Sequence, residues 1–135
     1  MKDLLIAYVD GSYNVKYPTI VGSGVVLINS DSTIEEFSFS VDDKDLAKMR
    51  QVGGELRASM VAIQKAVKKG YKDLIIYFDF EGIEKWVTRE WSCKNKYTQM
   101  YRDFVDAMKA VKEIGYDGVE LAGMYGIPAA EVKKI

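Results

Sequence analysis

The sequence of 135 residues contains no histidine, one cysteine and only two prolines. Without histidine, the chain cannot use Ser-His-Asp or Cys-His catalysis, and it cannot hold zinc through imidazole groups. Its single cysteine, Cys93, cannot form an internal disulfide, and thiolate clusters for zinc or iron–sulfur centres are excluded as well. Any chemistry must therefore rest on carboxylates, lysines, tyrosines or hard metal ions held by oxygen atoms.

Long hydrophobic runs are also missing from the sequence. None approaches the roughly 18 apolar residues of a membrane span, and the first residues lack the apolar stretch of a signal peptide. We therefore expect a cytoplasmic protein with no membrane partner. The chain has 48% hydrophobic and 29% charged residues, which is the balance of a globular protein. Its length predicts a single domain over residues 1–135, and we expect a monomer.

The hydrophobic pattern predicts a mixed α/β domain. Three strand-like runs joined by short connections favour antiparallel hairpins, and a later apolar strand that follows a helix favours parallel pairing. The expected strands cover residues 4–9, 20–29, 33–41, 74–78 and 119–122, and the expected helices cover residues 54–69, 82–91, about 96–115 and 128–134. This order predicts one mixed five-stranded sheet, with three antiparallel strands followed by two parallel ones and helices on both faces.

Three carboxylates occupy positions that could carry chemistry. Asp10 and Asp79 each follow an apolar strand, and ligands of open α/β sheets bind outside the carboxyl ends of the strands. Glu55 lies in the expected first turn of the first helix, on its inward face, where a buried charge needs a partner. Three clustered carboxylates repel one another unless a cation neutralises them. Their oxygen atoms suit Mg²⁺ or Mn²⁺, and two such ions about 3.5–4 Å apart can drive phosphodiester hydrolysis.

Each of these carboxylates also has a purely structural interpretation. Asp10 followed by Gly11 is a common turn pair. Asp79 could cap the helix that follows it, and Glu55 could favour the N-terminus of its helix electrostatically. The combination of all three at the ends of the right elements favours the hypothesis of a metal site.

Three segments that contain these carboxylates resemble type 1 ribonuclease H, in particular its bacterial branch. They are residues 7–12, 53–58 and 75–79, and the similarity extends from residue 1 to about residue 110. The resemblance implies that Asp10, Glu55 and Asp79 are three of four catalytic carboxylates that bind two Mg²⁺ ions, with Mn²⁺ as an alternative. It also implies cleavage of the RNA strand of RNA–DNA hybrids, which leaves 5′-phosphate and 3′-hydroxyl ends.

A second group of residues points to a nucleic-acid partner. It combines two tryptophans and four cations, which suits base stacking and phosphate contact: Lys85, Trp86, Arg89, Trp91, Lys94 and Lys96. Trp86 also fits a core position, and the lysines also fit a solvated face. From these residue types we expect nucleic-acid contacts at Trp86, Trp91, Lys94 and Lys96. Residues 81–86, with Trp91 after them, are similar to the helix and basic protrusion of the bacterial family. The same resemblance implies further hybrid contacts at Gly11, Ser12 and Gln51.

Residues 112–135 depart from the family. A type 1 enzyme carries its fourth catalytic aspartate on the last helix, whereas this chain has Ala130 near that position and Glu131 beside it. Glu131 is therefore the candidate fourth catalytic carboxylate. The segment is weakly similar to a strand and a helix of barrel-type sugar isomerases and epimerases.

The leading hypothesis is a metal-dependent endonuclease that hydrolyses the RNA strand of RNA–DNA hybrids. Two alternatives stay open because the fourth carboxylate is not evident. One is a non-catalytic or weakly active nucleic-acid-binding module with a ribonuclease H-like fold, and the other is a chimeric chain. Cleavage of a labelled hybrid with Mg²⁺ or Mn²⁺ separates the first hypothesis from both alternatives.

Overall fold

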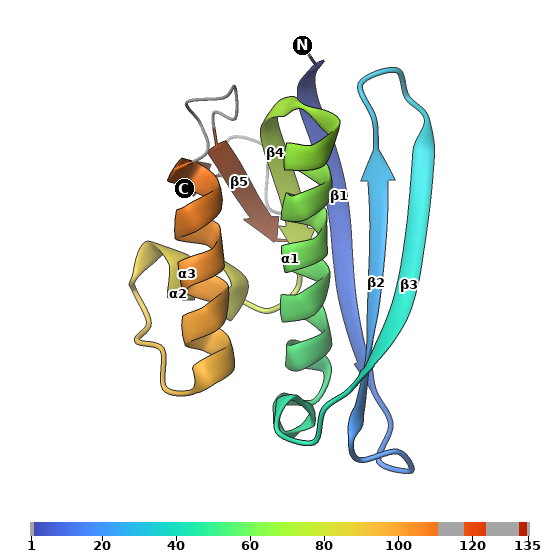
Figure 1. Cartoon of the computed structure of the whole chain (residues 1–135), viewed down its shortest axis with the longest axis vertical. Coiled ribbons are helices and arrows are strands. Elements are labelled where there is room, and N and C mark those ends of the chain that lie inside the picture. Colours follow the sequence, from blue (N-terminus) through green and yellow to red (C-terminus); the bar gives the residue numbers. More distant parts are fainter. Residues whose placement is uncertain (1, 111–117, 124–132, 135) are drawn as a thin grey trace.

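The computed structural model describes residues 2–110, 118–123 and 133–134. Its centre is one sheet with the strand order β3-β2-β1-β4-β5-β6 (Figure 1). The strands are β1 (Lys2–Tyr13), β2 (Ile20–Ile28), β3 (Ile34–Asp42), β4 (Tyr71–Phe78), β5 (Gly118–Gly123) and β6 (Lys133–Lys134). The helices are the 3₁₀-helix η1 (Leu46–Met49), α1 (Gln51–Lys69), α2 (Gly82–Thr88) and α3 (Lys96–Ala110). β2 is antiparallel to β1 and β3, while β4 is parallel to β1 and β5.

The predicted mixed α/β sheet is confirmed, but the expected count of five strands is wrong. Four long strands, β1 to β4, are followed by the shorter β5, and the two-residue β6 adds an antiparallel strand at the edge. Lys133 and Lys134 therefore lie in a strand and not in the helix predicted over residues 128–134, because their backbone pairs with that of β5. Residues 128–132 of that predicted helix lie outside the described residues.

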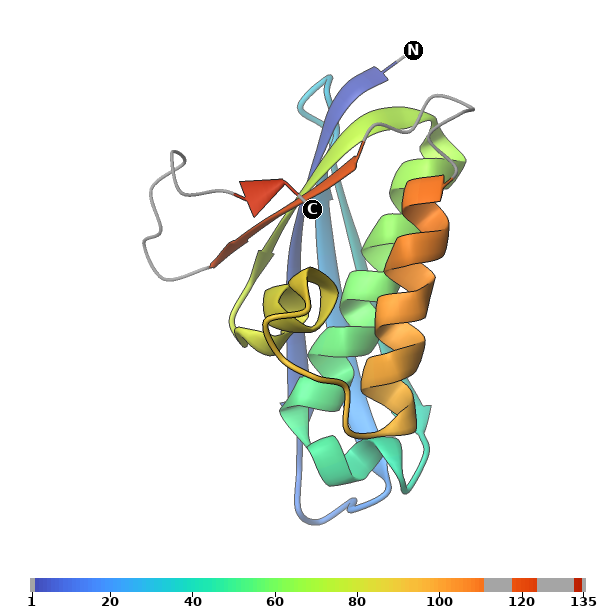
Figure 2. The ribbon, with the colours of Figure 1, turned by 90° about the vertical axis from the view of Figure 1, so that its left-hand side faces the viewer.

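The helices of the described residues share one face of the sheet. α1 packs across β1, β2 and β4, and α3 packs on α1, as the edge view shows (Figure 2). α2 packs beside α3 and contributes side chains to the same core. The predicted arrangement with helices on both faces is therefore not seen within the described part of the chain. No helix there is long and apolar enough to cross a membrane.

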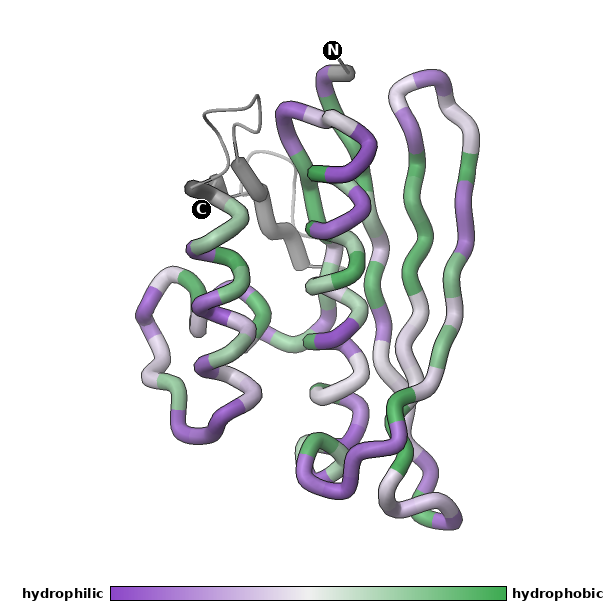
Figure 3. The backbone as a smooth tube through the Cα atoms, in the orientation of Figure 1, coloured by the Kyte–Doolittle hydropathy of each residue, from purple (hydrophilic) through white to green (hydrophobic). Residues whose placement is uncertain are grey.

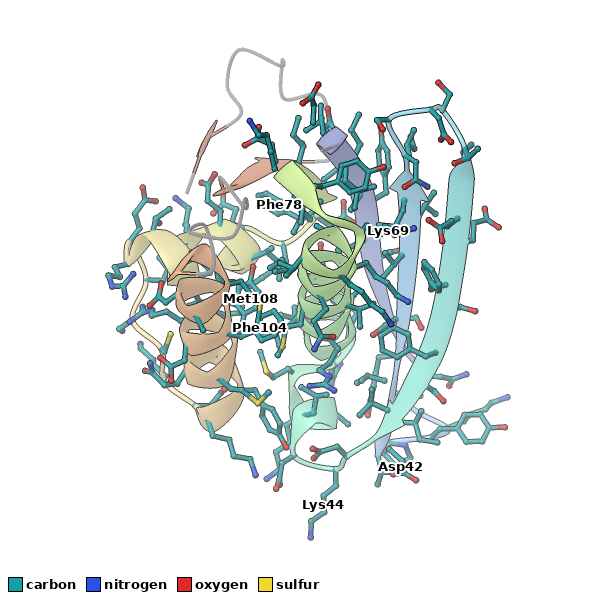
Figure 4. All side chains as sticks on the ribbon, turned by 45° about the horizontal axis from the view of Figure 1, so that its top comes forward. Asp42, Lys44, Lys69, Phe78, Phe104 and Met108 are labelled. Atoms are coloured by element: carbon teal, nitrogen blue, oxygen red, sulfur yellow. The ribbon has the colours of Figure 1, made fainter. Side chains whose placement is uncertain are left out.

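The hydrophobic core lies between the sheet and α1. Leu5, Ala7 and Val9 alternate along β1 and are at most 1% exposed beneath the helix. A row of small residues on α1 is completely buried, which lets the helix lie close to the sheet: Ser59, Ala62 and Ala66. Figure 3 shows hydrophobic stretches along β1, β2 and β4, in contrast to the hydrophilic loop before α3. Phe104 and Met108 extend from α3 toward α1 and close the core on that side (Figure 4).

β1 continues beyond the turn that the sequence predicts at Asp10. Its antiparallel pairing with β2 places Asp10 opposite Gly24 and extends to Tyr13. The chain reverses only afterwards, where the N–H of Tyr17 donates to the carbonyl oxygen of Asn14. Asp10 is thus a strand residue, and the turn interpretation of Asp10 is wrong because the β2 ladder keeps the backbone extended.

α1 begins at Gln51, before the predicted start at residue 54. η1 leads into the helix, and Arg50 between them has a positive φ of 54°. Glu55 consequently lies in the second turn, beyond the first turn in which the helix dipole acts most strongly. α2 ends at Thr88 and not at residue 91, because Arg89 has a left-handed φ of 69°.

Candidate active site at the ends of β1 and β4

Asp10 and Asp79 occupy equivalent positions along neighbouring parallel strands. The register of β1 and β4 pairs Tyr8 with Tyr77. Two residues further along, the same register aligns Asp10 with Asp79, which directly follows β4. Both aspartates are exposed. The sheet therefore brings these two predicted site residues to one edge, where a ligand can reach them.

Glycines let the start of α1 reach this edge of the sheet. A Cβ atom on Gly11 would lie 1.9 Å from the carbonyl oxygen of Gln51, and one on Gly54 would lie 2.0 Å from the carbonyl oxygen of Gly22. The buried hydroxyl of Ser23 on β2 donates to the carbonyl oxygen of Gly54 at 2.7 Å. The backbone of α1 thus contacts the backbones of β1 and β2 directly, and any larger side chain at these positions would separate them.

Glu55 is the buried member of the carboxylate group. It is only 3% exposed. Its Oε1 accepts the backbone N–H of Asp79 at 2.5 Å, and its Oε2 accepts that of Phe80 at 3.3 Å. The hydroxyl of Ser59 donates to the carbonyl oxygen of Glu55 at 2.9 Å, one turn further along α1. Glu55 therefore reaches from α1 to the end of β4 and lies beside Asp79.

The surroundings of Glu55 disfavour its ionised form. Burial is the largest cause that raises the pKa of Glu55 from 4.5 to about 7, and the negative charges of Asp79 and Asp10 act in the same direction. The backbone N–H groups of Asp79 and Phe80 act in the opposite direction. Both aspartates are thus within electrostatic reach of Glu55. Perturbed carboxylates of this kind are typical of functional sites.

The carboxylates offer the hard oxygen donors that Mg²⁺ and Mn²⁺ prefer. Among residues 2–110, 118–123 and 133–134, no group of three or more His, Cys, Asp or Glu side chains stands close enough together to hold a metal ion. Glu55 instead directs its carboxylate to backbone N–H groups. The donor chemistry of Asp10, Glu55 and Asp79, and the repulsion among their charges, fit a divalent cation. Glu131 and Ala130 lie outside the described residues, so the fourth carboxylate stays a prediction.

Ser12 on β1 and Gln51 at the start of α1 are both exposed, and we call these two residues the helix-entrance surface. Gly11 lies between Asp10 and Ser12, beneath the carbonyl group of Gln51. The structure therefore places Gly11 against Gln51, while the side chain of Ser12 points to the opposite face of β1 and lies against Gly22. Gly11 serves the close packing of α1, while the side chains of Ser12 and Gln51 are accessible to a ligand.

The second predicted contact region contains a cluster of three aromatic rings. The ring of Phe80 lies 5.8 Å from the ring of Trp86 and 5.8 Å from that of Trp91, measured between centroids. Trp86 is 8% exposed and belongs to the hydrophobic core, as its structural interpretation proposes, whereas Trp91 is 36% exposed. Both tryptophans line a pocket of about 490 Å³ that also includes Lys94. Trp91 is thus the more accessible ring for a nucleic acid.

Most cations of this region already have acidic partners. The ion pairs are Lys85 with Glu90 at 2.7 Å, Arg89 with Asp106 at 2.7 Å and Lys96 with Asp45 at 3.7 Å. We call residues 91–96 the basic loop. Within the described residues, Lys94 is in no ion pair and is exposed. The region therefore offers a nucleic acid fewer free positive charges than its sequence indicates.

Arg102 of α3 holds the backbone of this region, a role that sequence reasoning does not identify. Its guanidinium donates from Nε to the carbonyl oxygen of Trp86 at 2.6 Å and from a terminal nitrogen to that of Trp91 at 2.8 Å. These acceptors lie 16 and 11 residues away along the chain. An arginine on an amphipathic helix gives no local signal of such distant backbone partners.

A comparison with protein families matches most of the chain to one family model. The model is described as reverse transcriptase-like and covers residues 8–117. This range contains Asp10, Glu55 and Asp79 and ends before β5. No curated protein sequence matches the chain.

Solved structures of ribonuclease H1 share the fold. Ribonuclease H1 from the halophilic archaeon Halobacterium salinarum has a TM-score of 0.71 and 21% sequence identity, over 94% of this chain and 87% of that one. The N-terminal ribonuclease H domain of a Mycobacterium tuberculosis protein, solved as a fusion with maltose binding protein, has a TM-score of 0.68 and 16% identity, over 95% and 84% of the two chains. LC11-RNase H1, isolated from compost and solved in complex with an RNA/DNA hybrid, has a TM-score of 0.67 and 17% identity, over 94% and 87%. These likenesses confirm the predicted ribonuclease H-like fold.

Proposed function

Since the chain belongs to the reverse transcriptase-like family, we propose that it is an endonuclease that hydrolyses the RNA strand of RNA–DNA hybrids. The position of Glu55 is the observation that carries this proposal. From α1, Glu55 binds the backbone at the end of β4, where the strand register aligns Asp79 with Asp10. Two exposed carboxylates and one buried carboxylate at a single sheet edge offer the kind of oxygen donors that metal-assisted phosphodiester hydrolysis uses.

Asp10, Glu55 and Asp79 would hold the cations, either two Mg²⁺ ions or Mn²⁺ in their place, with Glu131 as the candidate fourth carboxylate. Bound cations supply an activated water and stabilise the charge that develops on the leaving 3′ oxygen. The chain itself fixes the end of β4, because Glu55 accepts the N–H groups of Asp79 and Phe80. With a pKa of about 7, Glu55 is partly protonated at neutral pH. Ionisation of Glu55 on metal binding would release a proton.

Recognition of the hybrid would use two surfaces of the chain. Ser12 and Gln51 offer exposed hydrogen-bonding groups beside Asp10, and the ribose 2′-hydroxyl distinguishes RNA from DNA at such a position. Trp91 and Lys94 on the basic loop offer an aromatic ring and a free cation for the sugar-phosphate backbone. The complex of LC11-RNase H1 with an RNA/DNA hybrid supports a hybrid as the ligand. The products would carry 5′-phosphate and 3′-hydroxyl ends.

One observation favours a second candidate function, a nucleic-acid-binding module without catalysis. In the part of the chain that the structure describes, the carboxylates do not stand in a preassembled metal site. Such a module would use the helix-entrance surface and the basic loop in the same way. It would bind the hybrid without cleaving either strand.

Hybrid cleavage by the wild type and by Asp10→Asn tests the proposal. Asparagine preserves the shape of the side chain but removes the ligand charge, so cleavage with Mg²⁺ should be lost while hybrid binding persists. Asp42→Asn at the exposed end of β3 is the matched control, because it removes the same charge from the sheet edge and should cleave like the wild type. Hybrid binding by the wild type without cleavage in either Mg²⁺ or Mn²⁺ would establish the second candidate instead.

A further inference from the structure

One hydrogen bond joins two segments that are 54 residues apart in the sequence. The hydroxyl of Tyr97 donates to Oδ2 of Asp43 at 2.5 Å. Tyr97 lies in the first turn of α3, directly after the basic loop, and Asp43 lies between β3 and η1. Neither residue belongs to the carboxylate group at the ends of β1 and β4. The bond therefore links the two surfaces assigned to the hybrid without being part of either.

On one side of this link, Asp43 holds the start of η1. Its Oδ1 accepts the backbone N–H groups of Asp45 at 3.0 Å and Leu46 at 3.2 Å, while its Oδ2 binds Tyr97. The hydrogen bond from Tyr97 is the largest cause that lowers the pKa of Asp43, so the ionised carboxylate is the form that is stabilised. η1 leads directly to Gln51 at the start of α1. Asp43 thus fixes the approach to the helix-entrance surface.

On the other side of the link, Tyr97 is anchored by its ring. It packs with Tyr13 against a small cluster of buried side chains, Val21, Leu46 and Ala47. This cluster is separate from the main core and connects β2 with η1. The ring therefore contacts β2 and η1, and η1 leads to Gln51 at the start of α1, while the hydroxyl fixes the orientation of the ring.

The ion pair that also joins this end of α3 to the start of η1 is weaker. Lys96 forms an ion pair with Asp45 at 3.7 Å, but its side chain is 71% exposed. Exposed ion pairs contribute little because water and salt screen them. Phe104 and Met108, which extend from α3 toward α1, lie in the second half of α3 (Figure 4). Tyr97 is therefore the residue placed to fix the basic loop relative to η1.

We propose that the Tyr97–Asp43 hydrogen bond is a positioning strut that holds the basic loop and the helix-entrance surface at the separation that one hybrid duplex requires. This inference rests on the proposed function. A duplex is stiff, so two contact surfaces act together only if their separation matches it. A separation fixed before binding also avoids the cost of ordering the loop in the complex. Tyr97 acts through the loop and is a positioning residue.

Tyr97→Phe tests the strut because it keeps the ring and removes only the hydroxyl. In the free protein, we expect faster hydrogen exchange at the backbone amides of the basic loop and of Asp45 and Leu46. Tyr71→Phe is the matched control, since the Tyr71 hydroxyl donates to Asn29 at 2.7 Å, also between elements, where β4 begins and away from both surfaces. That control should leave exchange in the basic loop unchanged.

Hybrids of graded length provide the second measurement. For hybrids long enough to contact both surfaces, Tyr97→Phe should raise KM about 3- to 10-fold, the effect of one lost hydrogen bond, and leave kcat unchanged. For hybrids that reach only the helix-entrance surface, KM should not change. Asp43→Asn with Tyr97 intact should retain most of the wild-type affinity, because its amide can still accept the N–H groups of η1 and donate to the Tyr97 oxygen.

Three results would overturn the strut. They are unchanged loop exchange in Tyr97→Phe, a KM rise that is equal at every hybrid length, and an equal KM rise in Tyr71→Phe. A wild type that neither binds nor cleaves any hybrid would overturn the proposed function, and the role of the strut in hybrid binding with it. Loop exchange distinguishes the two failures, since it reports on the hydrogen bond without any hybrid.

Discussion

The carboxylate of Glu55 accepts the backbone N–H of Asp79 at 2.5 Å, and this contact joins α1 to the end of β4. One carboxylate of the candidate site therefore positions another. Because Glu55 is buried and the charge of Asp10 also raises its pKa, the group is electrostatically strained without a cation. The predictions below follow from this strain and from the packing that produces it.

Asp10→Asn should raise the melting temperature in metal-free buffer by about 2–4 °C, the shift that corresponds to roughly 1 kcal/mol. The reason is that the negative charge of Asp10 disfavours the ionised form of Glu55. Thermal unfolding in the presence of EDTA measures the effect, with Asp42→Asn as the charge-matched control. Added Mg²⁺ should then stabilise the wild type more than the variant. A lower melting temperature for Asp10→Asn would contradict the account.

The raised pKa of Glu55 predicts a pH dependence of stability. The folded protein keeps this proton up to about pH 7, whereas the unfolded chain releases it near pH 4.5, so folding takes up a proton in this window. The stability that protonated Glu55 contributes is complete below about pH 4.5 and is lost as the pH rises through about 7. The stability of Glu55→Gln relative to the wild type should therefore increase across this range and then level off.

Urea unfolding of both proteins at a series of pH values, in EDTA, measures this difference. Glu35 and Asp43 have pKa values that hydrogen bonds lower. Their contributions to the pH dependence of stability are the same in both proteins and cancel in the difference. Those groups contribute stability that is lost as the pH falls, which is the opposite trend. Parallel stability curves for the two proteins would show that Glu55 has an ordinary pKa.

The ion pairs of the basic loop predict that its lysines differ in hybrid binding. Lys94→Ala should reduce the slope of log K against log salt by about one phosphate contact. Lys96→Ala should reduce it less, since Lys96 is already near Asp45. Fluorescence anisotropy with a labelled hybrid at several salt concentrations measures both slopes. Equal slopes for the two variants and the wild type would show that these lysines are solvated and do not contact the hybrid.

The close packing of α1 predicts a strong effect of a single methyl group. In Gly54→Ala the new Cβ would lie 2.0 Å from the carbonyl oxygen of Gly22, so the start of α1 must move and carry Glu55 with it. We expect a loss of about 1–3 kcal/mol in the free energy of unfolding and a loss of hybrid cleavage. Gly24→Ala is the control for stability, because a Cβ there meets nothing within 4 Å. Equal melting temperatures for both variants would contradict the described packing.

Much of the carboxylate geometry follows from local sequence patterns. Asp10 and Asp79 follow apolar strands, and the intervening helix makes those strands parallel, which is enough to predict that both reach one edge. The inward position of Glu55 follows from its place one helical turn before Ser59, in a row of small residues that can face a sheet. The structure adds the N–H of Asp79 as its partner, since a backbone group gives no signal in a sequence.

Other features depend on contacts between distant segments and could not be predicted. The pairing of Arg89 with Asp106 neutralises a positive charge that the sequence offers to phosphates. The hydrogen bond between Tyr97 and Asp43 spans 54 residues. Arg50 adopts a positive φ directly before the early start of α1, although the sequence offers no glycine at that position. Each feature is decided by the folded arrangement and not by local propensity.

The most direct test of the central claim is an analysis of cleavage products from a hybrid that carries different labels on its RNA and DNA strands. With Mg²⁺, the wild type should cut only the RNA strand, leaving 5′-phosphate and 3′-hydroxyl ends, and Asp79→Asn should cut neither strand while still binding. Cleavage of RNA by Asp79→Asn at the wild-type rate, or by the wild type at an unchanged rate in excess EDTA, would contradict hydrolysis through cations held at the ends of β1 and β4.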